Sequence, residues 1–420
     1  MFTLTVSRAL VWLALVAVAA ATQPSPAERA IAEARRFIAN NPSEAAGHNA
    51  LGMALARRAR ETADPAFYDQ ASEALNKSLE LAPDNFEARK LEVWLLLGKH
   101  EFYRALELAK RLNRRAADDP MIYGFIADAC AELGKYDEAE EAAQWMLDLG
   151  RSSVPGLTRA AHLREIFGDS EGAAELMISA YEKVDPRQIE DRAWVLTHLA
   201  HLRLFGGQLK AAERLLDEAL RQFPGYHYAQ FQMARLRTMQ GRHAESVELL
   251  RARYHSAPHP ENLFDLAVAL QNAQRRSEAR KTFRDFEEVA RRESESADNA
   301  NRELIFYFAD YAKQPKEALA VARREVARRR DVHTLDAVAW AYYRAGDLNG
   351  ARREIEAALK TGIREARILY HAGAIATSQR DYTAAARYLS DSLATNAHSE
   401  VASEAKRLLA RLPRTSASQR

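Results

Sequence analysis

The 420-residue sequence contains one cysteine, Cys130. An intramolecular disulfide is therefore excluded, and no cysteine stands near the amino terminus to carry a lipid. Glycine (17 residues) and proline (13 residues) are too sparse for an all-β chain full of tight turns. Stability must come from packing along the chain, and Cys130 is expected to be a core residue.

An excess of charge of one sign is also missing. Sixty basic side chains stand against fifty-eight acidic ones, which leaves a formal net charge of +2. The balance gives no bulk attraction for nucleic acid or for acidic substrates, so no nucleic-acid partner is predicted. The densest arginine cluster, at residues 323–330, is interleaved with Glu325 and followed by Asp331. This pattern is typical of a solvated helix face.

Catalytic signatures are absent as well. The sequence contains no G-x-S-x-G, no P-loop, no H-E-x-x-H and no dinucleotide-binding fingerprint. Folding can bring two carboxylates together as acid and base, but among fifty-eight acidic residues such pairs arise without meaning. We therefore expect a protein that is not an enzyme and that holds no cofactor.

The only long apolar run lies at the amino terminus. Arg8 precedes an apolar stretch from Ala9 to Ala21 that ends in small residues, and Gln23–Pro26 then breaks any helix. These features predict a secretory signal peptide over residues 1–21 and a periplasmic or secreted mature protein. A retained membrane anchor is the alternative, although the run is short for a bilayer span. No stable membrane insertion is expected after cleavage.

A repeat dominates the rest of the chain. Within Ala193–Tyr226, two apolar-periodic segments are separated by Gly206-Gly207 and closed by Pro224-Gly225. Small residues mark both segments, at Ala200 and Ala212. The first marker recurs at steps of 33, 34 or 39 residues as Ala127, Ala161, Ala200, Ala234, Ala267, Phe306, Ala339 and Gly373. The second recurs with identical steps as Ala139, Ala173, Ala212, Ser246, Ala279, Ala318, Ala351 and Ala385.

This pattern resembles the tetratricopeptide repeat (TPR), whose unit of about 34 residues is a helical hairpin with small residues at its crossing points. The resemblance implies an all-α fold, a right-handed α-solenoid of about ten stacked hairpins. We expect a lead-in helix in residues 22–44, the solenoid in 45–397, and a C-terminal helix with a frayed tail in 398–420. The two 39-residue steps predict kinks near 188–191 and 294–301.

The resemblance also implies a binding surface, because the first helices of such units line the concave face of the superhelix. Large aromatic side chains with occasional charges on that face suit an extended or helical protein segment. The alternative is that these rings pack between repeats. The peptide-groove candidates are Trp194, His201, Phe205, Tyr228, Phe231, Arg235, Phe264, Tyr307, Tyr311, Trp340 and Tyr343. The leading hypothesis is a protein-binding scaffold or adaptor in the periplasm.

His198 and His201 stand three residues apart on one expected helix, close enough to share a metal ion. The sequence shows no third ligand at matching spacing, so no metal site is predicted. The pair and the aromatic residues nevertheless motivate a second hypothesis, a binding protein for a small ligand, a glycan or a metal ion that serves an envelope transport or export system.

Overall fold

The computed structural model describes residues 24–150 and 152–413. The expected signal peptide and the end of the expected tail lie outside these residues. The described part of the chain consists of helices, turns and loops without a strand, and none of its helices combines the length and apolarity needed to cross a bilayer.

Ten helical hairpins stack along the described residues between a leading helix, α2 (Pro26–Asn40), and a final helix, α23 (Ala402–Arg411). The expected all-α solenoid of about ten units is confirmed. The hairpins are α3 (Ala45–Thr62) with α4 (Ala66–Leu81), α5 (Phe86–Gly98) with α6 (Phe102–Asn113), α7 (Pro120–Glu132) with α8 (Tyr136–Leu149), α9 (Val154–Ile166) with α10 (Ser170–Lys183), α11 (Ile189–Phe205) with α12 (Leu209–Gln222), α13 (His227–Met239) with α14 (His243–Ser256), α15 (Pro260–Asn272) with α16 (Arg276–Glu293), α17 (Asn301–Phe306) and its π-helical continuation η1 (Tyr307–Tyr311) with α18 (Pro315–Arg328), α19 (Val332–Arg344) with α20 (Leu348–Leu359), and α21 (Ala366–Ser378) with α22 (Tyr382–Thr395).

Small residues set how closely the two helices of a hairpin approach. Ala200 and Ala212 are both fully buried, where α11 packs on α12. At Gly373 in α21 an added Cβ would lie 2.6 Å from Leu389 Cγ in α22, closer than any side chain tolerates. The packing therefore explains why the marker positions hold alanine or glycine in most units.

The first helices lie on the concave side of the stack. Successive first helices contact one another, as α3 does with α5, α7 with α9, α11 with α13 and α19 with α21. In a curved stack the inner layer is the more crowded one, so these contacts identify the first helices as the inner layer. We call the surface that they present the inner face.

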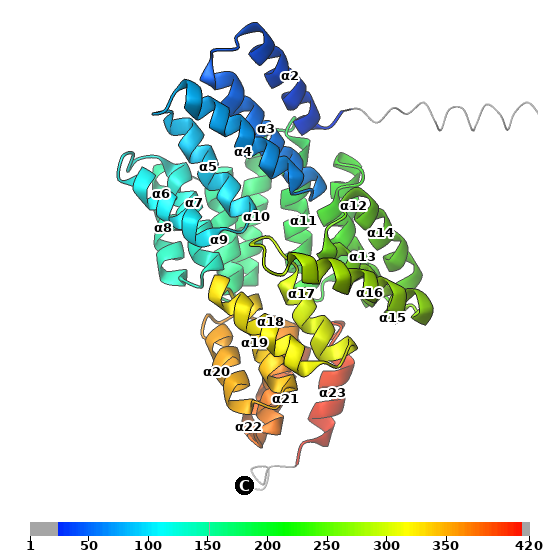
Figure 1. Cartoon of the computed structure of the whole chain (residues 1–420). Coiled ribbons are helices and arrows are strands. Elements are labelled where there is room, and N and C mark those ends of the chain that lie inside the picture. The colour runs from blue at the N-terminus through cyan, green and yellow to red at the C-terminus, as the bar shows by residue number, and fades with distance from the viewer. Residues whose placement is uncertain (1–23, 151, 414–420) are drawn as a thin grey trace, which may run out of the picture.

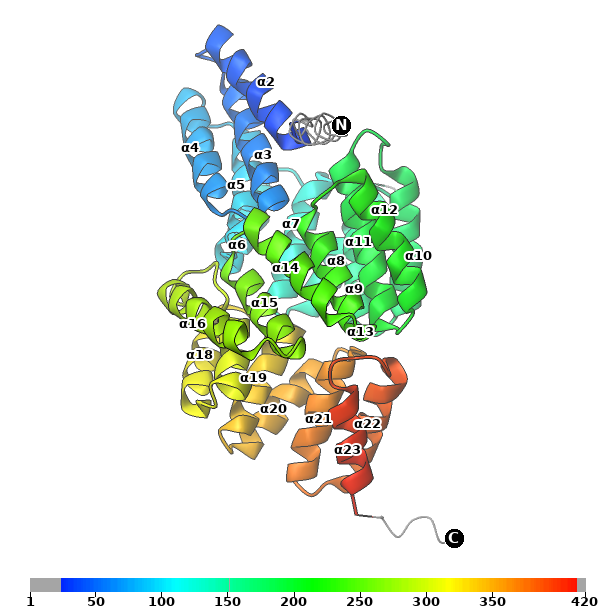
Figure 2. The ribbon, with the colours of Figure 1, turned by 90° about the vertical axis from the view of Figure 1, so that its right-hand side faces the viewer.

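The solenoid curls far enough for its two halves to touch. In both views α2–α6 lie above α18–α23, with α2 and α23 at opposite ends, and α13–α14 lie at the height of α8–α12 (Figures 1 and 2). The backbone N–H of Arg330, just before α19, donates to Glu132 O at the end of α7, at 3.0 Å. Val332 N–H likewise donates to the hydroxyl of Tyr136, 196 residues earlier, at 2.9 Å. The end of α7 thus meets the start of α19, six units later, and we call the two sets of units joined in this way the two turns of the solenoid.

The two places where the repeat spacing lengthens to 39 residues contribute to the contact between the two halves of the solenoid. The first adds a turn to the start of α11, which has 17 residues where α9 and α13 have 13. Its Glu190 and Asp191 form ion pairs with Arg60 at the end of α3, the latter at 2.8 Å. The second forms the loop before α17, where Asp298 lies 3.2 Å from His100 Nδ1 after α5. A kink at either place stays a prediction.

Candidate binding site on the inner face

Nine of the eleven candidate groove residues keep part of their side-chain surface exposed, and two are buried. Tyr228 is the most open of the nine at 36% exposure. Tyr307 (7% exposed) and Trp340 (5% exposed) are covered by their neighbours. These two residues therefore cannot serve as contact residues in the structure described here, and the expectation that they line an open groove is corrected.

Packing and hydrogen bonds account for the burial of Trp340. Its indole stacks on His371 of the next unit, with ring centroids 4.0 Å apart, and its Nε1–H donates to Asp310 Oδ2 at 2.9 Å. The sequence pattern placed Trp340 on the correct helix, but it could not show that His371 and Asp310 close over the ring. Trp340 joins three successive units instead of facing a ligand.

The rings around α17 and η1 form an aromatic core. The hydroxyl of Tyr307 donates to Glu287 at 2.7 Å, and its ring packs on Phe283 at 5.5 Å. Tyr311 packs on Phe283 at 4.6 Å and meets Phe264 edge to face at 5.9 Å. Phe264 and Tyr311 are therefore only the exposed margins of a buried cluster. Tyr343 is likewise a partly exposed ring at the margin of a buried one, with its centroid 4.8 Å from that of Trp340.

A continuous row of partly exposed side chains runs along α11 and crosses to α13. We call it the inner ladder. The ring centroids of Trp194 and His198 are 4.6 Å apart and those of His201 and Phe205 are 4.3 Å apart. The guanidinium carbon of Arg235 then lies 4.8 Å from the Phe205 ring and 5.7 Å from the Phe231 ring. The inner ladder comprises Trp194, His198, His201, Phe205, Arg235 and Phe231.

One end of the inner ladder opens into a pocket between the two turns of the solenoid. The pocket has a volume of about 20 Å³, roughly the space that one water molecule needs. Its walls carry both signs of charge, and Arg367 Nη2 lies 3.7 Å from Glu365 Oε1. The residues that line it include Phe205, Arg235 and Met239 from the first turn and Glu365, Arg367 and Glu400 from the second.

Asp265 on α15 is partly desolvated although its side chain is not fully buried. Asp265 on α15 keeps 24% of its side chain exposed and its carboxylate lies 2.6 Å from Arg253 Nη1. Desolvation nevertheless raises the pKa of Asp265 to about 7, and the opposing effect of Arg253 is smaller. Surrounding protein therefore replaces part of the water around this carboxylate, which strengthens its ion pair with Arg253.

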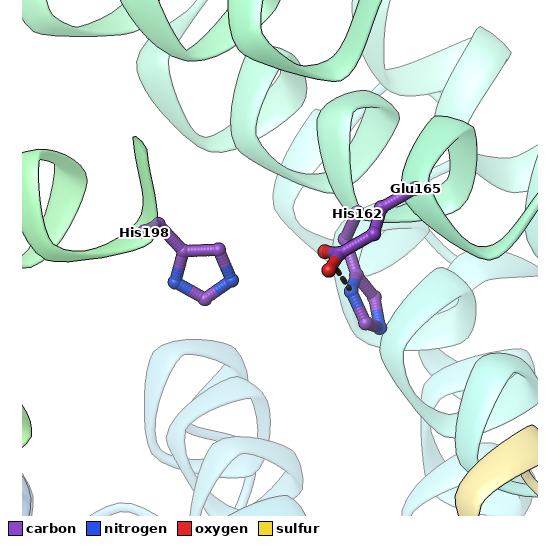
Figure 3. Close-up of side chains that lie close together, drawn as sticks. All are labelled: His162, Glu165 and His198. Atoms are coloured by element: carbon purple, nitrogen blue, oxygen red, sulfur yellow. Dashed lines mark ion pairs between the residues drawn. The ribbon is translucent and has the colours of Figure 1, made fainter. Parts of the chain in front are cut away.

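Two histidines and a glutamate form a compact cluster on α9 and α11. Figure 3 shows His162 and Glu165 together, with His198 facing them from the neighbouring helix. One ligand-type atom from each residue lies within 4.8 Å of the other two. His162 Nδ1 and Glu165 Oε2 are 4.0 Å apart. The structure thus brings two further metal-ligating groups to the His198–His201 pair, from the first helix of the preceding unit.

His201 holds the glutamate of this cluster in place. Its Nε2 lies 2.8 Å from Glu165 Oε1, and its Nδ1 lies 3.2 Å from Nε2 of Gln232 on α13. The Nε2–H of His201 donates to the Glu165 carboxylate, and its Nδ1 faces the side-chain amide of Gln232. Three successive first helices therefore contribute to one polar network.

The protonation states of the cluster differ from those of isolated side chains. Desolvation lowers the pKa of His198 to about 4, and the neighbouring His201 acts in the same direction. Desolvation alone would raise the pKa of Glu165, but His201 and His162 outweigh it and hold that pKa well below its usual range. Burial alone would lower the pKa of His162, but the ion pair with Glu165 outweighs it and raises that pKa. At neutral pH the cluster thus presents the neutral imidazole of His198 and the carboxylate of Glu165, the forms that ligate metal ions, whereas at His162 a metal ion would compete with a proton.

Sequence reasoning missed His162 and Glu165, although a signal was present. His162 follows Ala161 as His201 follows Ala200, so the two histidines occupy the same position in consecutive units. Glu165 stands four residues after the same marker. The register that selected His201 would have selected both residues had it been applied one unit earlier.

The comparisons with known proteins identify the fold. No protein-family model matches the sequence, and no curated protein matches it either. Human IFIT1, solved as a dimer with PPP-AAAA, is 12% identical with a TM-score of 0.50, and the match covers 83% of this chain and 90% of that one. PilW, described as a type IV pilus biogenesis factor, gives 11% identity and a TM-score of 0.41 over 48% of this chain and 92% of its own. A TPR protein from Parabacteroides merdae gives 19% identity and a TM-score of 0.37, with 62% and 100% covered.

The fold and the repeat register together define the class: the chain is an α-solenoid of the tetratricopeptide-repeat type. The match to human IFIT1 shows a shared architecture, and at 12% identity it says nothing about the ligand.

Proposed function

We propose that the protein is a non-enzymatic binding scaffold whose inner face takes up an extended segment of another protein. The observation that carries the proposal is the inner ladder, because it presents a row of reachable aromatic rings that alternate with polar and charged groups. Aromatic rings bury a large apolar area at little entropic cost, and arginine adds directional hydrogen bonds to backbone carbonyls and carboxylates.

The charge of the inner face favours a protein over a nucleic acid. The human IFIT1 structures contain PPP-AAAA or m7Gppp-AAAA. In this chain the arginines near the inner ladder are accompanied by carboxylates, among them Glu165, Asp265 and Glu365. Carboxylates in such numbers oppose a phosphate backbone, whereas a peptide offers groups that pair with both signs.

We further propose that the scaffold works in the periplasm. The support for this location is the apolar stretch Ala9–Ala21 with its preceding Arg8 and following Gln23–Pro26, the features of a secretory signal. Cell fractionation tests the location: the full chain should appear in the periplasmic fraction with its first residues removed, and a chain that starts at Pro24 should stay in the cytoplasm.

Photo-crosslinking in cells tests the binding site. A photoreactive amino acid at position 205 or 231 should capture a distinct partner protein, and the same residue at position 145 should not. Trp145 is a matched control because it is an exposed aromatic side chain, 47% exposed, on the outer helix α8. Equal capture at all three positions, or capture of RNA at positions 205 and 231, would contradict the proposal.

A further inference from the structure

We propose that His162, Glu165 and His198 form a binding site for one divalent transition-metal ion, with Zn²⁺ as the best-fitting member of this class. The inference goes beyond the proposed role in protein binding and does not depend on it. It rests on where the fold places three side chains of the correct chemistry.

The donor set suits zinc. Two imidazole nitrogens and one carboxylate oxygen are a common combination around Zn²⁺ when a fourth position stays open to water or to another ligand. Imidazole nitrogen suits zinc, copper, nickel and iron, whereas Mg²⁺ and Ca²⁺ prefer sites made of oxygen atoms alone. The cluster therefore discriminates between the two kinds of cation.

The geometry requires only a small adjustment. The three ligand-type atoms lie within 4.8 Å of one another. In a tetrahedral site with metal–ligand distances of about 2.0–2.2 Å, such atoms stand roughly 3.4 Å apart. Side-chain rotations that move each atom by about 1 Å would close the gap. In Figure 3 the Glu165 carboxylate lies between the rings of His162 and His198, which come from α9 and α11.

The site can be reached and is supported. The side chain of His162 is 46% exposed and that of Glu165 is 19% exposed, so an ion can enter from the inner face. On the opposite side His201 binds Glu165 at 2.8 Å and is itself held by Gln232. Groups that orient a ligating carboxylate in this way are a regular feature of metal sites. We assign His201 this positioning role.

Calorimetric titration of metal-stripped protein with ZnCl₂ is the primary test. We expect one ion to bind per chain in the parent. His198→Ala should weaken binding at least about 100-fold, since losing even an orienting partner costs roughly 10- to 100-fold. His255→Ala is the matched control, because His255 is an exposed histidine on α14 away from the cluster, and its affinity should equal that of the parent. MgCl₂ and CaCl₂ should give no comparable heat.

Two further variants keep the test decisive if an alanine disturbs folding. Glu165→Gln preserves the size of the side chain and should also lose binding, because a neutral amide is a poor metal ligand. His201→Ala should weaken binding by roughly 10- to 100-fold, less than the loss of a ligand. Far-UV circular dichroism and the melting temperature without metal verify that each variant is folded.

Two readouts distinguish ligation from a purely structural role. Co²⁺ bound to the parent should show the visible absorption bands of a four-coordinate site, and these bands should disappear in Glu165→Gln. Excess Zn²⁺ should raise the melting temperature of the parent but not that of His198→Ala. Absence of Zn²⁺ and Co²⁺ binding in the parent would overturn the proposal. Equal affinity in the parent, His198→Ala and Glu165→Gln would do so too.

Discussion

The side-chain amide of Asn396 donates a hydrogen bond of 2.9 Å to the backbone carbonyl oxygen of Leu204, which lies 192 residues earlier in the chain. Leu204 lies at the end of α11, where helix carbonyls lack partners within the helix, and Asn396 is 4% exposed. This contact joins the end of one turn of the solenoid to the start of the final segment. The turns are thus held together by specific polar contacts and not only by the packing of neighbouring units.

Asn396→Ala should reduce the free energy of unfolding by about 1–3 kcal/mol. The substitution removes the donor to Leu204 and also the acceptor for His398 N–H, which is 2.9 Å from Asn396 Oδ1. Urea unfolding followed by circular dichroism measures the change. Asn272→Ala, at an exposed position at the end of α15, is the control and should leave the midpoint nearly unchanged. An equal midpoint for both variants would show that the contact does not stabilise the closure.

Gly134→Ala should destabilise the protein more than Gly241→Ala. Both glycines have a left-handed backbone, with φ of +70° and +74°, so each alanine costs about 1 kcal/mol in strain. An added Cβ at Gly134 would lie 2.6 Å from Arg330 O in the other turn, whereas nothing lies within 4 Å at Gly241. The clash should add about 1–3 kcal/mol at Gly134 alone.

The measurement for this pair is again urea unfolding, with Gly241→Ala as the matched control for strain. Amide hydrogen exchange adds a local readout, because the N–H of Arg330 is bonded to Glu132 O and should exchange faster in Gly134→Ala. If both variants lose the same stability and Arg330 remains protected, the two turns do not depend on this close approach.

Sequence reasoning succeeded wherever the information repeats from unit to unit. Ala200 and Ala212 gave the register because each unit needs small residues at the same crossing, and the structure buries both. The contacts that close the solenoid do not recur from unit to unit, so the sequence contains no pattern that predicts them. Arg60 reaches Glu190 across 130 residues, and neither residue belongs to a pattern that recurs.

In the candidate site, too, the sequence predicted the features that repeat from unit to unit and missed the contacts that do not. Phe205 and Phe231 could be selected because the register specifies which positions face inward. Trp340 occupies an equivalent position, yet it is buried because His371 of the next unit and Asp310 of the previous one close over it. Burial at a single inward position depends on the identities of neighbours in other units, and periodicity alone does not reveal these.

Deprotonation of His259 should make the protein less stable as the pH rises from about 6.5 to about 9. Desolvation alone would lower the pKa of His259, but the ion pair with Asp298 and the charges of Glu261 and Glu293 outweigh it and raise the pKa to about 9. The Nε2 atom lies 3.6 Å from Asp298 Oδ1, and His100 approaches the same carboxylate. The stabilisation is complete below the unfolded pKa of about 6.5 and disappears as pH passes the folded value, a loss of about 3 kcal/mol.

The difference between parent and variant isolates this effect from other titrations. Urea unfolding at a series of pH values should show that His259→Gln lacks the alkaline loss, while His255→Ala, an exposed histidine on α14, retains it. Asp298→Asn should also flatten the profile, since it removes the main partner. A parent and a His259→Gln variant with parallel profiles would refute the assignment.

Substitutions at Trp340 and at Phe205 should separate an effect on the stability of the fold from an effect on partner binding. Trp340→Ala removes a buried ring that stacks on His371 and bonds to Asp310, so it should lower the free energy of unfolding by about 3–5 kcal/mol. Phe205→Ala truncates a partly exposed ring and should cost about 1 kcal/mol or less.

For partner capture the order of the effects should be reversed. Phe205→Ala should abolish crosslinking from position 231, because the Phe205 ring and the Phe231 ring are bridged by Arg235. Trp340→Phe, which keeps an aromatic ring in the core, should bind the partner as the parent does. Unfolding and crosslinking measured on the same three variants decide the matter, and a Phe205→Ala variant that keeps full capture would remove the inner ladder from the binding site.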